Sequence, residues 1–164
     1  MYFNILMANR VHEIYGNRLR IRACGLLIEK EELLMVNHQS ISKHDFWAPP
    51  GGGVGFGESI EACLVREMLE ETGLKTEVLA FLFVCEFIEK PLHAIELFFL
   101  LRRIGGSLVT GHDPEMKMED QIIQTVRFLD TDEIRIMDPA TLHGIFRFVK
   151  EPLQITGLRG YFKL

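Results

Sequence analysis

The sequence predicts an α+β fold in which a mixed, curved β-sheet is sandwiched between helices. The main observation is the order of segments, which runs strands, helix, strands, helix, without the regular βαβ alternation of a doubly wound parallel sheet. A second observation is the length: 164 residues suit one domain, 1–164, with its core over about 19–150. We find no internal repeat, low-complexity tract or linker.

The first elements are β-type. The apolar, β-rich runs Leu19–Glu29 and Glu32–Asn37 flank a charged turn and predict a pair of strands. The polar stretch His38–Asp45 predicts a loop, and solvated side chains are expected for the loop histidines His38, His44 and His112. Pro49-Pro50, followed by the glycines 51–53, excludes both a helix and a central strand. This stretch therefore indicates unusual backbone geometry or a close approach of the backbone to another group.

The clearest helix of the chain is predicted over Glu58–Thr72. It ends at Gly73, which suits the left-handed conformation that commonly closes a helix. Two long β-type runs, Lys75–Glu89 and His93–Arg103, follow it and are joined at Lys90-Pro91-Leu92. They predict a second pair of strands.

The last part of the chain predicts one more strand and one more helix. The strand is expected over Ile122–Leu129, and Asp130–Glu133 has a helix-capping pattern with Thr131 or Asp132 ahead of Ile134. Pro139–Lys150 carries apolar residues at helical spacing and predicts the second helix. Residues 1–18 and 155–164 receive no assignment.

Composition narrows the function classes. The net charge of −5 argues against a nucleic-acid polymer as partner, because such proteins rely on clustered Lys and Arg. Cys24, Cys63 and Cys85 are odd in number and lack a CxxC pair, so we expect buried, reduced thiols. Apolar runs are too short for a membrane span and the start lacks a signal-peptide pattern, so we expect a cytoplasmic protein with no membrane partner.

The predicted helix over Glu58–Thr72 has an unusual distribution of charge. Placed at about 100° per residue, Glu67 and Glu71 continue the face that Ile60 and Leu64 begin. A second apolar strip on the other side is formed by Ala62, Val65 and Leu69. This pattern predicts a helix packed on two sides, with carboxylates that are not simply bathed in water.

Such a cluster of carboxylates needs compensation. Two carboxylates about 5 Å apart repel by roughly 3 kcal/mol at an effective dielectric constant near 20, and the C-terminal end of a helix also disfavours negative charge. One interpretation is a solvated acidic surface with an Arg66–Glu70 pair. We favour the other, a site for a hard divalent cation such as Mg²⁺ or Mn²⁺.

The glycine-rich loop is not a Walker A loop. Gly52 and Gly57 have the required spacing, but Glu58 stands where that motif needs lysine. An anionic side chain there would repel a triphosphate.

The stretch matches a known pattern instead. Gly52, five residues, Glu58, seven residues, Arg66-Glu67-Met68, one residue, Glu70-Glu71, one residue and Gly73-Leu74 resembles the complete box of the MutT-like Nudix hydrolases. Every defining position is filled. Gly55 stands where many relatives carry a further glutamate, a departure that we expect to affect substrate preference more than metal binding.

This resemblance implies the Nudix fold and a set of residue roles. A Mg²⁺ site, with Mn²⁺ as a possible substitute, would be formed by the Gly51 carbonyl and by the side chains of Glu67, Glu70 and Glu71. Arg66 would orient these glutamates by charge-assisted hydrogen bonds. The structural positions of the motif would be Gly52, Glu58, which anchors the loop against the helix, and Gly73.

The implied reaction is attack by water on a phosphorus atom of a diphosphate linkage, in a nucleoside triphosphate, ADP-ribose or a nucleotide sugar. The resemblance leaves open whether Glu67 or an acidic residue of a late loop accepts the proton. Glu119 is the candidate from that loop, with Glu115 and Asp120 as alternatives.

Substrate recognition and assembly are less defined. Phe46 and Trp47 either stack on the base or serve packing, and Pro91 either contributes to ADP-ribose specificity or is an ordinary hairpin proline. A homodimer is expected from the apolar content and from the resemblance, because members of this family commonly form dimers. The alternative function is a catalytically silent Nudix domain that senses a nucleotide ligand, although none of the box glutamates is lost. Isoprenoid diphosphate isomerisation usually calls for Cys and His residues that are not evident here.

Overall fold

The computed structural model describes residues 16–39, 45–111 and 123–164. Its larger sheet has five strands in the order β5-β1-β7-β6-β9. The strands of this sheet are β1 (Leu19–Leu26), β5 (Gly51–Gly53), β6 (Leu74–Glu89), β7 (Leu92–Gly106) and β9 (Gly160–Lys163). β1 runs parallel to β7 and β6 runs parallel to β9, whereas β1–β5 and β6–β7 are antiparallel. The sheet is therefore mixed, as predicted.

The smaller sheet is four-stranded and antiparallel. It has the order β2-β3-β4, with β8 also paired to β3. Its strands are β2 (Ile28–Glu29), β3 (Glu32–Gln39), β4 (Asp45–Ala48) and β8 (Ile123–Leu129). The strand pairs predicted on either side of the charged turn and of the Lys90-Pro91 turn are confirmed.

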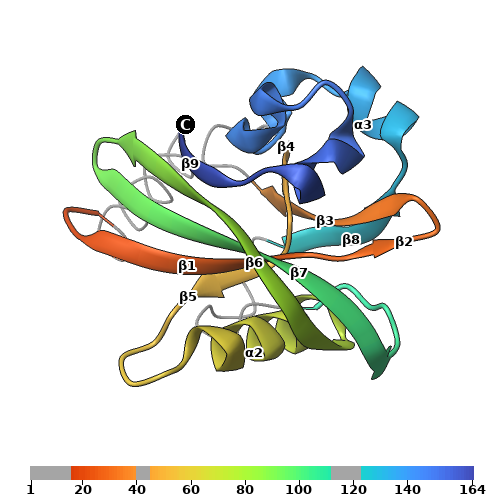
Figure 1. The fold of residues 1–164 in the computed structure, drawn as a ribbon, viewed down its shortest axis with the longest axis horizontal. Coiled ribbons are helices and arrows are strands. Elements are labelled where there is room, and N and C mark those ends of the chain that lie inside the picture. The colour runs from red at the N-terminus through yellow and green to blue at the C-terminus, as the bar shows by residue number, and fades with distance from the viewer. Residues whose placement is uncertain (1–15, 40–44, 112–122) are drawn as a thin grey trace, which may run out of the picture.

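Helices lie on both faces of the larger sheet. α2 (Ile60–Thr72) covers one face, and α3 (Thr131–Ile136) lies on the opposite side of the molecule with several short helical turns (Figure 1). Two groups of buried side chains fill the layers: one contains Leu64 and Met68 of α2, and the other contains Phe83 and Phe98 of the central strands. The α+β class with a mixed sheet between helical layers is confirmed.

α2 and α3 have side-chain caps. Ser59 caps α2 by accepting a hydrogen bond from the Ala62 amide at 3.1 Å, so Glu58 lies just before the helix rather than in it. Gly73 ends α2 in the left-handed conformation, with φ of 71°, as predicted. α3 begins with a capping box between Asp130 and Glu133, so the N-cap is Asp130 instead of Thr131 or Asp132.

The second helix predicted over Pro139–Lys150 is wrong. The chain forms separate 3₁₀ turns there and beyond: η2 (Pro139–Thr141), η3 (Gly144–Phe148) and η4 (Pro152–Gly157). The break falls at Leu142 and His143, whose ψ angles of 149° and 134° are not helical. The His143 amide donates to the Trp47 carbonyl at 2.9 Å, and Leu142 forms a β-bridge with Trp47. The backbone of β4 thus takes the hydrogen bond that a continuous helix needs.

The loop predicted over His38–Asp45 is wrong at both ends. β3 continues through His38 and Gln39, and β4 begins at Asp45, with His38 opposite Phe46. The intervening residues 40–44 lie outside the described residues. The prediction of solvated histidines is also wrong for His38, because burial lowers its pKa to about 4, with a further contribution from Arg22. His44 and His112 lie outside the described residues.

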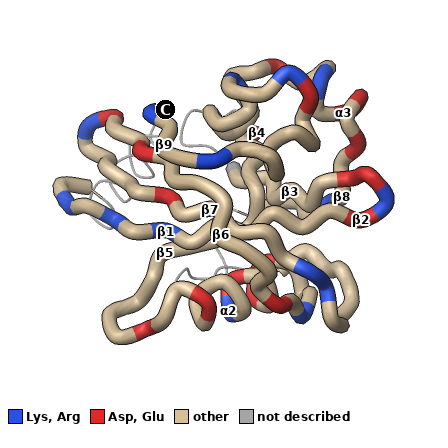
Figure 2. The backbone as a smooth tube through the Cα atoms, viewed as in Figure 1, with Lys and Arg blue, Asp and Glu red and all other residues tan. Residues whose placement is uncertain are grey.

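The three cysteines are buried and free, as predicted. Among the described residues, no helix combines the length and apolar character needed to cross a membrane. Asp and Glu residues recur along α2 (Figure 2). This is the helix that carries the predicted site.

Candidate active site

The site begins where β5 meets β1 at the edge of the larger sheet. Gly51 has a φ of 150°, and a Cβ atom there would lie 2.2 Å from the Ala23 carbonyl oxygen and 2.7 Å from the Cys24 Cα. Only glycine permits this approach of β5 to β1. The close approach and the absence of a central strand, both predicted from the Pro-Pro-Gly-Gly-Gly stretch, are confirmed.

The next glycine lies against the helix. A Cβ atom at Gly52 would lie between 2.1 and 2.5 Å from the carboxylate atoms of Glu67. The loop backbone therefore packs directly against this carboxylate. Any side chain at position 52 would displace it.

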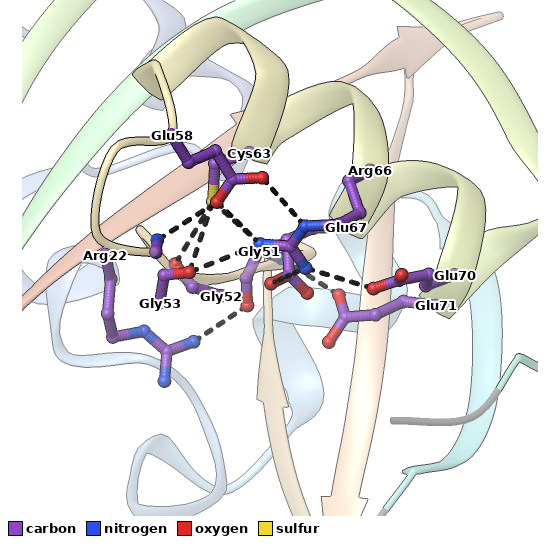
Figure 3. A network of polar contacts seen from close by, with 11 residues as sticks. Arg22, Gly51, Gly52, Gly53, Glu58, Cys63, Arg66, Glu67, Glu70 and Glu71 are labelled. Atoms are coloured by element: carbon purple, nitrogen blue, oxygen red, sulfur yellow. Dashed lines mark hydrogen bonds and ion pairs between the residues drawn. The ribbon is translucent and has the colours of Figure 1, made fainter. Parts of the chain in front are cut away.

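Arg66 is the centre of the polar network on α2. Its Nη1 donates to Glu67 Oε1 at 2.7 Å and to Glu70 Oε2 at 3.0 Å (Figure 3). Its Nε and Nη2 hold the two oxygens of Glu58 at 2.8 and 3.0 Å, the bidentate geometry that favours arginine over lysine. A single guanidinium thus gathers three carboxylates and supplies part of the positive charge that their repulsion requires.

Glu58 ties the loop to the helix. Besides its two bonds from Arg66, it accepts a hydrogen bond from the Gly55 amide at 3.0 Å. These contacts, that from Arg66 first, lower the pKa of Glu58 to about 2. The contact between loop and helix that the sequence predicts for Glu58 is present.

The inner face of α2 carries two carboxylates, as the helical projection predicts. Glu71 is buried and accepts a hydrogen bond from the Gly51 amide at 2.9 Å. The Glu67 side chain is 14% exposed, and burial raises its pKa, against the opposing effect of Arg66. The predicted packing of α2 on two sides is wrong, because Val65 and Leu69 are 41% and 48% exposed. In the described part of the chain, α2 contacts the sheet on its inner face only.

These residues fit a hard divalent cation by the chemistry of their donors. Glu67, Glu70 and Glu71 provide carboxylate oxygens and Gly51 a carbonyl oxygen, the ligands that Mg²⁺ prefers. The Gly51 amide is hydrogen-bonded to the Glu71 side chain, and Arg66 donates hydrogen bonds to both Glu67 and Glu70. Within the described residues, however, no three or more His, Cys, Asp or Glu side chains converge closely enough to hold a metal ion as they stand.

The predicted substrate residues lie on β4. Trp47 is half-buried and packs against the core group that contains Phe83 and Phe98, which gives it a packing role. Phe46 is also half-buried, and its ring centroid lies 6.3 Å from that of His143. Base stacking by Phe46 or Trp47 stays a prediction. Pro91 lies in the tight turn between β6 and β7, as a hairpin proline would.

The acidic candidates of the late loop, Glu119, Glu115 and Asp120, lie outside the described residues. Their place relative to Glu67 therefore stays a prediction.

Three polar residues near the box escaped the sequence analysis: Arg22 of β1, which is half-buried, and Glu96 of β7 and His143 before η3, which are buried. Arg22 Nη2 donates to the Gly51 carbonyl at 3.0 Å, and Glu96 contacts both Arg22 and His143. The available signal was a charged residue next to the apolar run of each strand, Arg22 before Ala23–Leu26 in β1 and Glu96 before Leu97–Leu101 in β7. His143 gave no such signal.

Comparison with known proteins agrees with this site. The family model of the NUDIX domain matches residues 17–150, so the chain belongs to the Nudix family. It is 34% identical to an ADP-ribose pyrophosphatase of Methanocaldococcus jannaschii over 91 residues, 54% of each chain. It is 33% identical to Nudix hydrolase 10 of Arabidopsis thaliana over 118 residues, 71% of this chain and 39% of that protein. It thus spans about half or less of the length of these relatives.

Solved structures share the fold. An ADP-ribose pyrophosphatase from Streptococcus suis matches 87% of this chain and 98% of its own, with a TM-score of 0.60 and 15% identity. A MutT Nudix hydrolase from Burkholderia pseudomallei matches 80% of this chain and 95% of its own, with a TM-score of 0.65 and 20% identity. At these identities the likeness concerns the fold alone.

Proposed function

We propose that this protein is a Mg²⁺-dependent pyrophosphohydrolase that cleaves the diphosphate linkage of a nucleoside diphosphate derivative. The observation that carries the proposal is the network around Arg66. Arg66 Nη1 lies 2.7 Å from Glu67 Oε1 and 3.0 Å from Glu70 Oε2, which brings the two carboxylates close together. They lie beside the loop whose Gly51 amide donates to Glu71. Every box glutamate is present, which favours catalysis over the alternative of a silent ligand sensor.

In this proposal the metal is held by Glu67, Glu70, Glu71 and the Gly51 carbonyl. When bound, it neutralises phosphate charge and lowers the pKa of the attacking water. Arg66 keeps the carboxylates of Glu67 and Glu70 turned toward each other, and Glu58 fixes the other side of its guanidinium.

The proton of the attacking water goes to a carboxylate. Glu67 suits this role because burial raises its pKa toward the range in which a carboxylate is an effective base. Glu119 is the second candidate, and the two are distinguished by the pH–rate profiles of Glu67→Gln and Glu119→Gln. The base is the residue whose substitution, with metal at saturating concentration, abolishes the fall in rate at low pH.

ADP-ribose is the first substrate to test. Its support is the name of the M. jannaschii relative. A mouse relative, 32% identical over 107 residues, is named 8-oxo-dGDP phosphatase, so oxidised nucleotides belong in the same panel. Nucleoside triphosphates, nucleotide sugars and dinucleoside polyphosphates complete it.

The test is hydrolysis of this panel in Mg²⁺ and in Mn²⁺ by the wild type, Glu67→Gln and Glu70→Gln. We expect both substitutions to lower kcat/KM by about 10³-fold, since each removes a charged oxygen from the metal site. Glu61→Gln is the matched control, because Glu61 lies in the same helix with an exposed side chain. It is expected to leave kcat/KM unchanged.

Unchanged hydrolysis in Glu67→Gln and Glu70→Gln refutes the mechanism. Tight binding of a nucleotide without turnover in either metal favours the sensor function instead.

A further inference from the structure

A second line of polar contacts leaves the box on the side away from Arg66. The guanidinium of Arg22 points at the Gly51 carbonyl, and its Nη2 donates to that oxygen at 3.0 Å (Figure 3). On the other side of the same residue, the Gly51 amide donates to Glu71. Gly51 is therefore hydrogen-bonded through both its amide and its carbonyl group, to side chains of α2 and β1 respectively.

Glu96 forms an ion pair with Arg22, although Arg22 Nε is buried and makes no hydrogen bond among the described residues. The two residues are paired in the parallel register of β1 and β7, and Glu96 Oε1 lies 3.4 Å from Arg22 Nε. Glu96 is only 8% exposed. Burial acts to raise its pKa, but His143 and Arg22 outweigh this effect and bring the pKa to about 2. Glu96 is thus an ionised, buried partner for the guanidinium.

His143 completes the line. Its Nε2 lies 2.8 Å from Glu96 Oε2, and its Nδ1 accepts a hydrogen bond from the Ile145 amide at 3.3 Å. Because Nδ1 accepts, the proton resides on Nε2, which donates to Glu96. The His143 amide in turn donates to the Trp47 carbonyl of β4 at 2.9 Å. The smaller sheet is thereby linked to the box through three side chains.

We propose that His143, Glu96 and Arg22 form a positioning relay that fixes the direction of the Gly51 carbonyl and thereby the geometry of the divalent-cation site. This inference rests on the proposed function, in which that carbonyl is a metal ligand. Partners of this kind, bonded to ligands rather than to the metal, typically change metal affinity about 10- to 100-fold when removed.

Positioning and simple charge predict opposite effects for Arg22. As a cation near Glu67 and Glu71, Arg22 repels a metal ion, so charge alone predicts that its removal strengthens metal binding. Positioning predicts that its removal weakens binding, because the Gly51 carbonyl loses its fixed direction. The sign of the change therefore distinguishes the two.

The experiment measures Mn²⁺ affinity of the full chain by electron paramagnetic resonance of free Mn²⁺. We expect Arg22→Met to weaken Mn²⁺ binding about 10-fold or more, and Glu96→Gln by a similar factor. The double variant Arg22→Met/Glu96→Gln, which leaves the net charge unchanged, is expected to bind no more weakly than Arg22→Met, since both residues act in one unit. Arg22→Lys retains the charge but loses the planar guanidinium, and it is expected to weaken Mn²⁺ binding as much as Arg22→Met. It therefore serves as the test if Arg22→Met does not fold.

The chain offers matched controls for chemistry and for stability. Glu86 contacts His93 Nε2 at 3.0 Å, a Glu–His pair between β6 and β7, and Glu86→Gln is expected to change Mn²⁺ affinity by less than about twofold. Ile145→Val trims the buried core beside His143 without removing a polar contact. Thermal unfolding then separates loss of stability from loss of metal affinity.

Wild-type affinity or tighter binding in Arg22→Met and Arg22→Lys overturns the relay while leaving the metal site intact. Equal Mn²⁺ binding by the wild type and by Glu67→Gln and Glu70→Gln overturns the proposed function, and the relay with it.

Discussion

The two faces of α2 differ in a way that hydrophobicity alone does not predict. The inner face adds buried Glu71 and nearly buried Glu67 to its apolar residues, whereas Val65 and Leu69 on the outer face are about half exposed. The inward carboxylates are stable there because each has a partner: the Gly51 amide for Glu71 and Arg66 for Glu67. The difference teaches that polar partners decide which glutamates of this helix are buried.

The largest effect is expected from disturbing the contact between the loop and the inner face. Gly52→Ala places a methyl group within 2.1 to 2.5 Å of the Glu67 carboxylate, which must move away from Arg66. We expect kcat/KM to fall about 100-fold, because displacement of Glu67, the proposed base and metal ligand, by about 1 Å has effects of that order. The flexible end of Glu67 gives way, so the free energy of unfolding should change by less than about 1 kcal/mol.

Gly53→Ala is the matched control, because the nearest atom to its new methyl group, Arg20 Nη2, lies 3.9 Å away. Steady-state kinetics and urea unfolding measure both variants. Equal activity in Gly52→Ala and Gly53→Ala would contradict the close contact between loop and helix.

An intermediate effect is expected from the pH dependence of stability. The folded-state pKa of Glu58 is lowered to about 2 from the ordinary 4.5, so its stabilising contribution is complete above about pH 4.5 and is lost as the pH falls toward 2. The free energy of unfolding of the wild type, measured with urea, should therefore decrease as the pH falls from 4.5 to 2. Glu58→Gln should remove about 1 kcal/mol of that dependence, the upper end for a surface ion pair.

The comparison between the wild type and Glu58→Gln isolates this residue, because Glu96 contributes in the same direction in both proteins. Parallel stability curves between pH 4.5 and pH 2 would show that Arg66 does not stabilise ionised Glu58.

The smallest effect is expected on the outer face. Leu69→Lys should change the free energy of unfolding by less than about 0.5 kcal/mol, because the side chain is about half exposed. Met68→Ala, one residue away and fully buried, should cost about 2 to 5 kcal/mol. Thermal unfolding measures the stability of both variants, and light scattering measures their molecular mass. A change in molecular mass in Leu69→Lys would instead place the predicted homodimer interface on this face.

Sequence reasoning succeeded where the determining contacts are local. The spacing of Glu58, Arg66, Glu67 and Glu70 defines the box, and helical periodicity alone brings Arg66 beside Glu70. The strand pairs followed from β-type runs separated by short turns. The failure over 139–150 has the opposite cause, because the non-helical Leu142 and His143 bond to Trp47, far away in sequence.

The sequence by itself determined the family, through a Nudix box whose residues lie within 23 positions and therefore converge through one loop and one helix. Only the tertiary structure decided that Val65 and Leu69 face outward and that Arg22, Glu96 and His143 meet beside Gly51. Arg22 and Gly51 are 29 residues apart, and Glu96 and His143 are 47 apart. Contacts at such separations depend on strand register and on the packing of the two sheets, which no local pattern encodes.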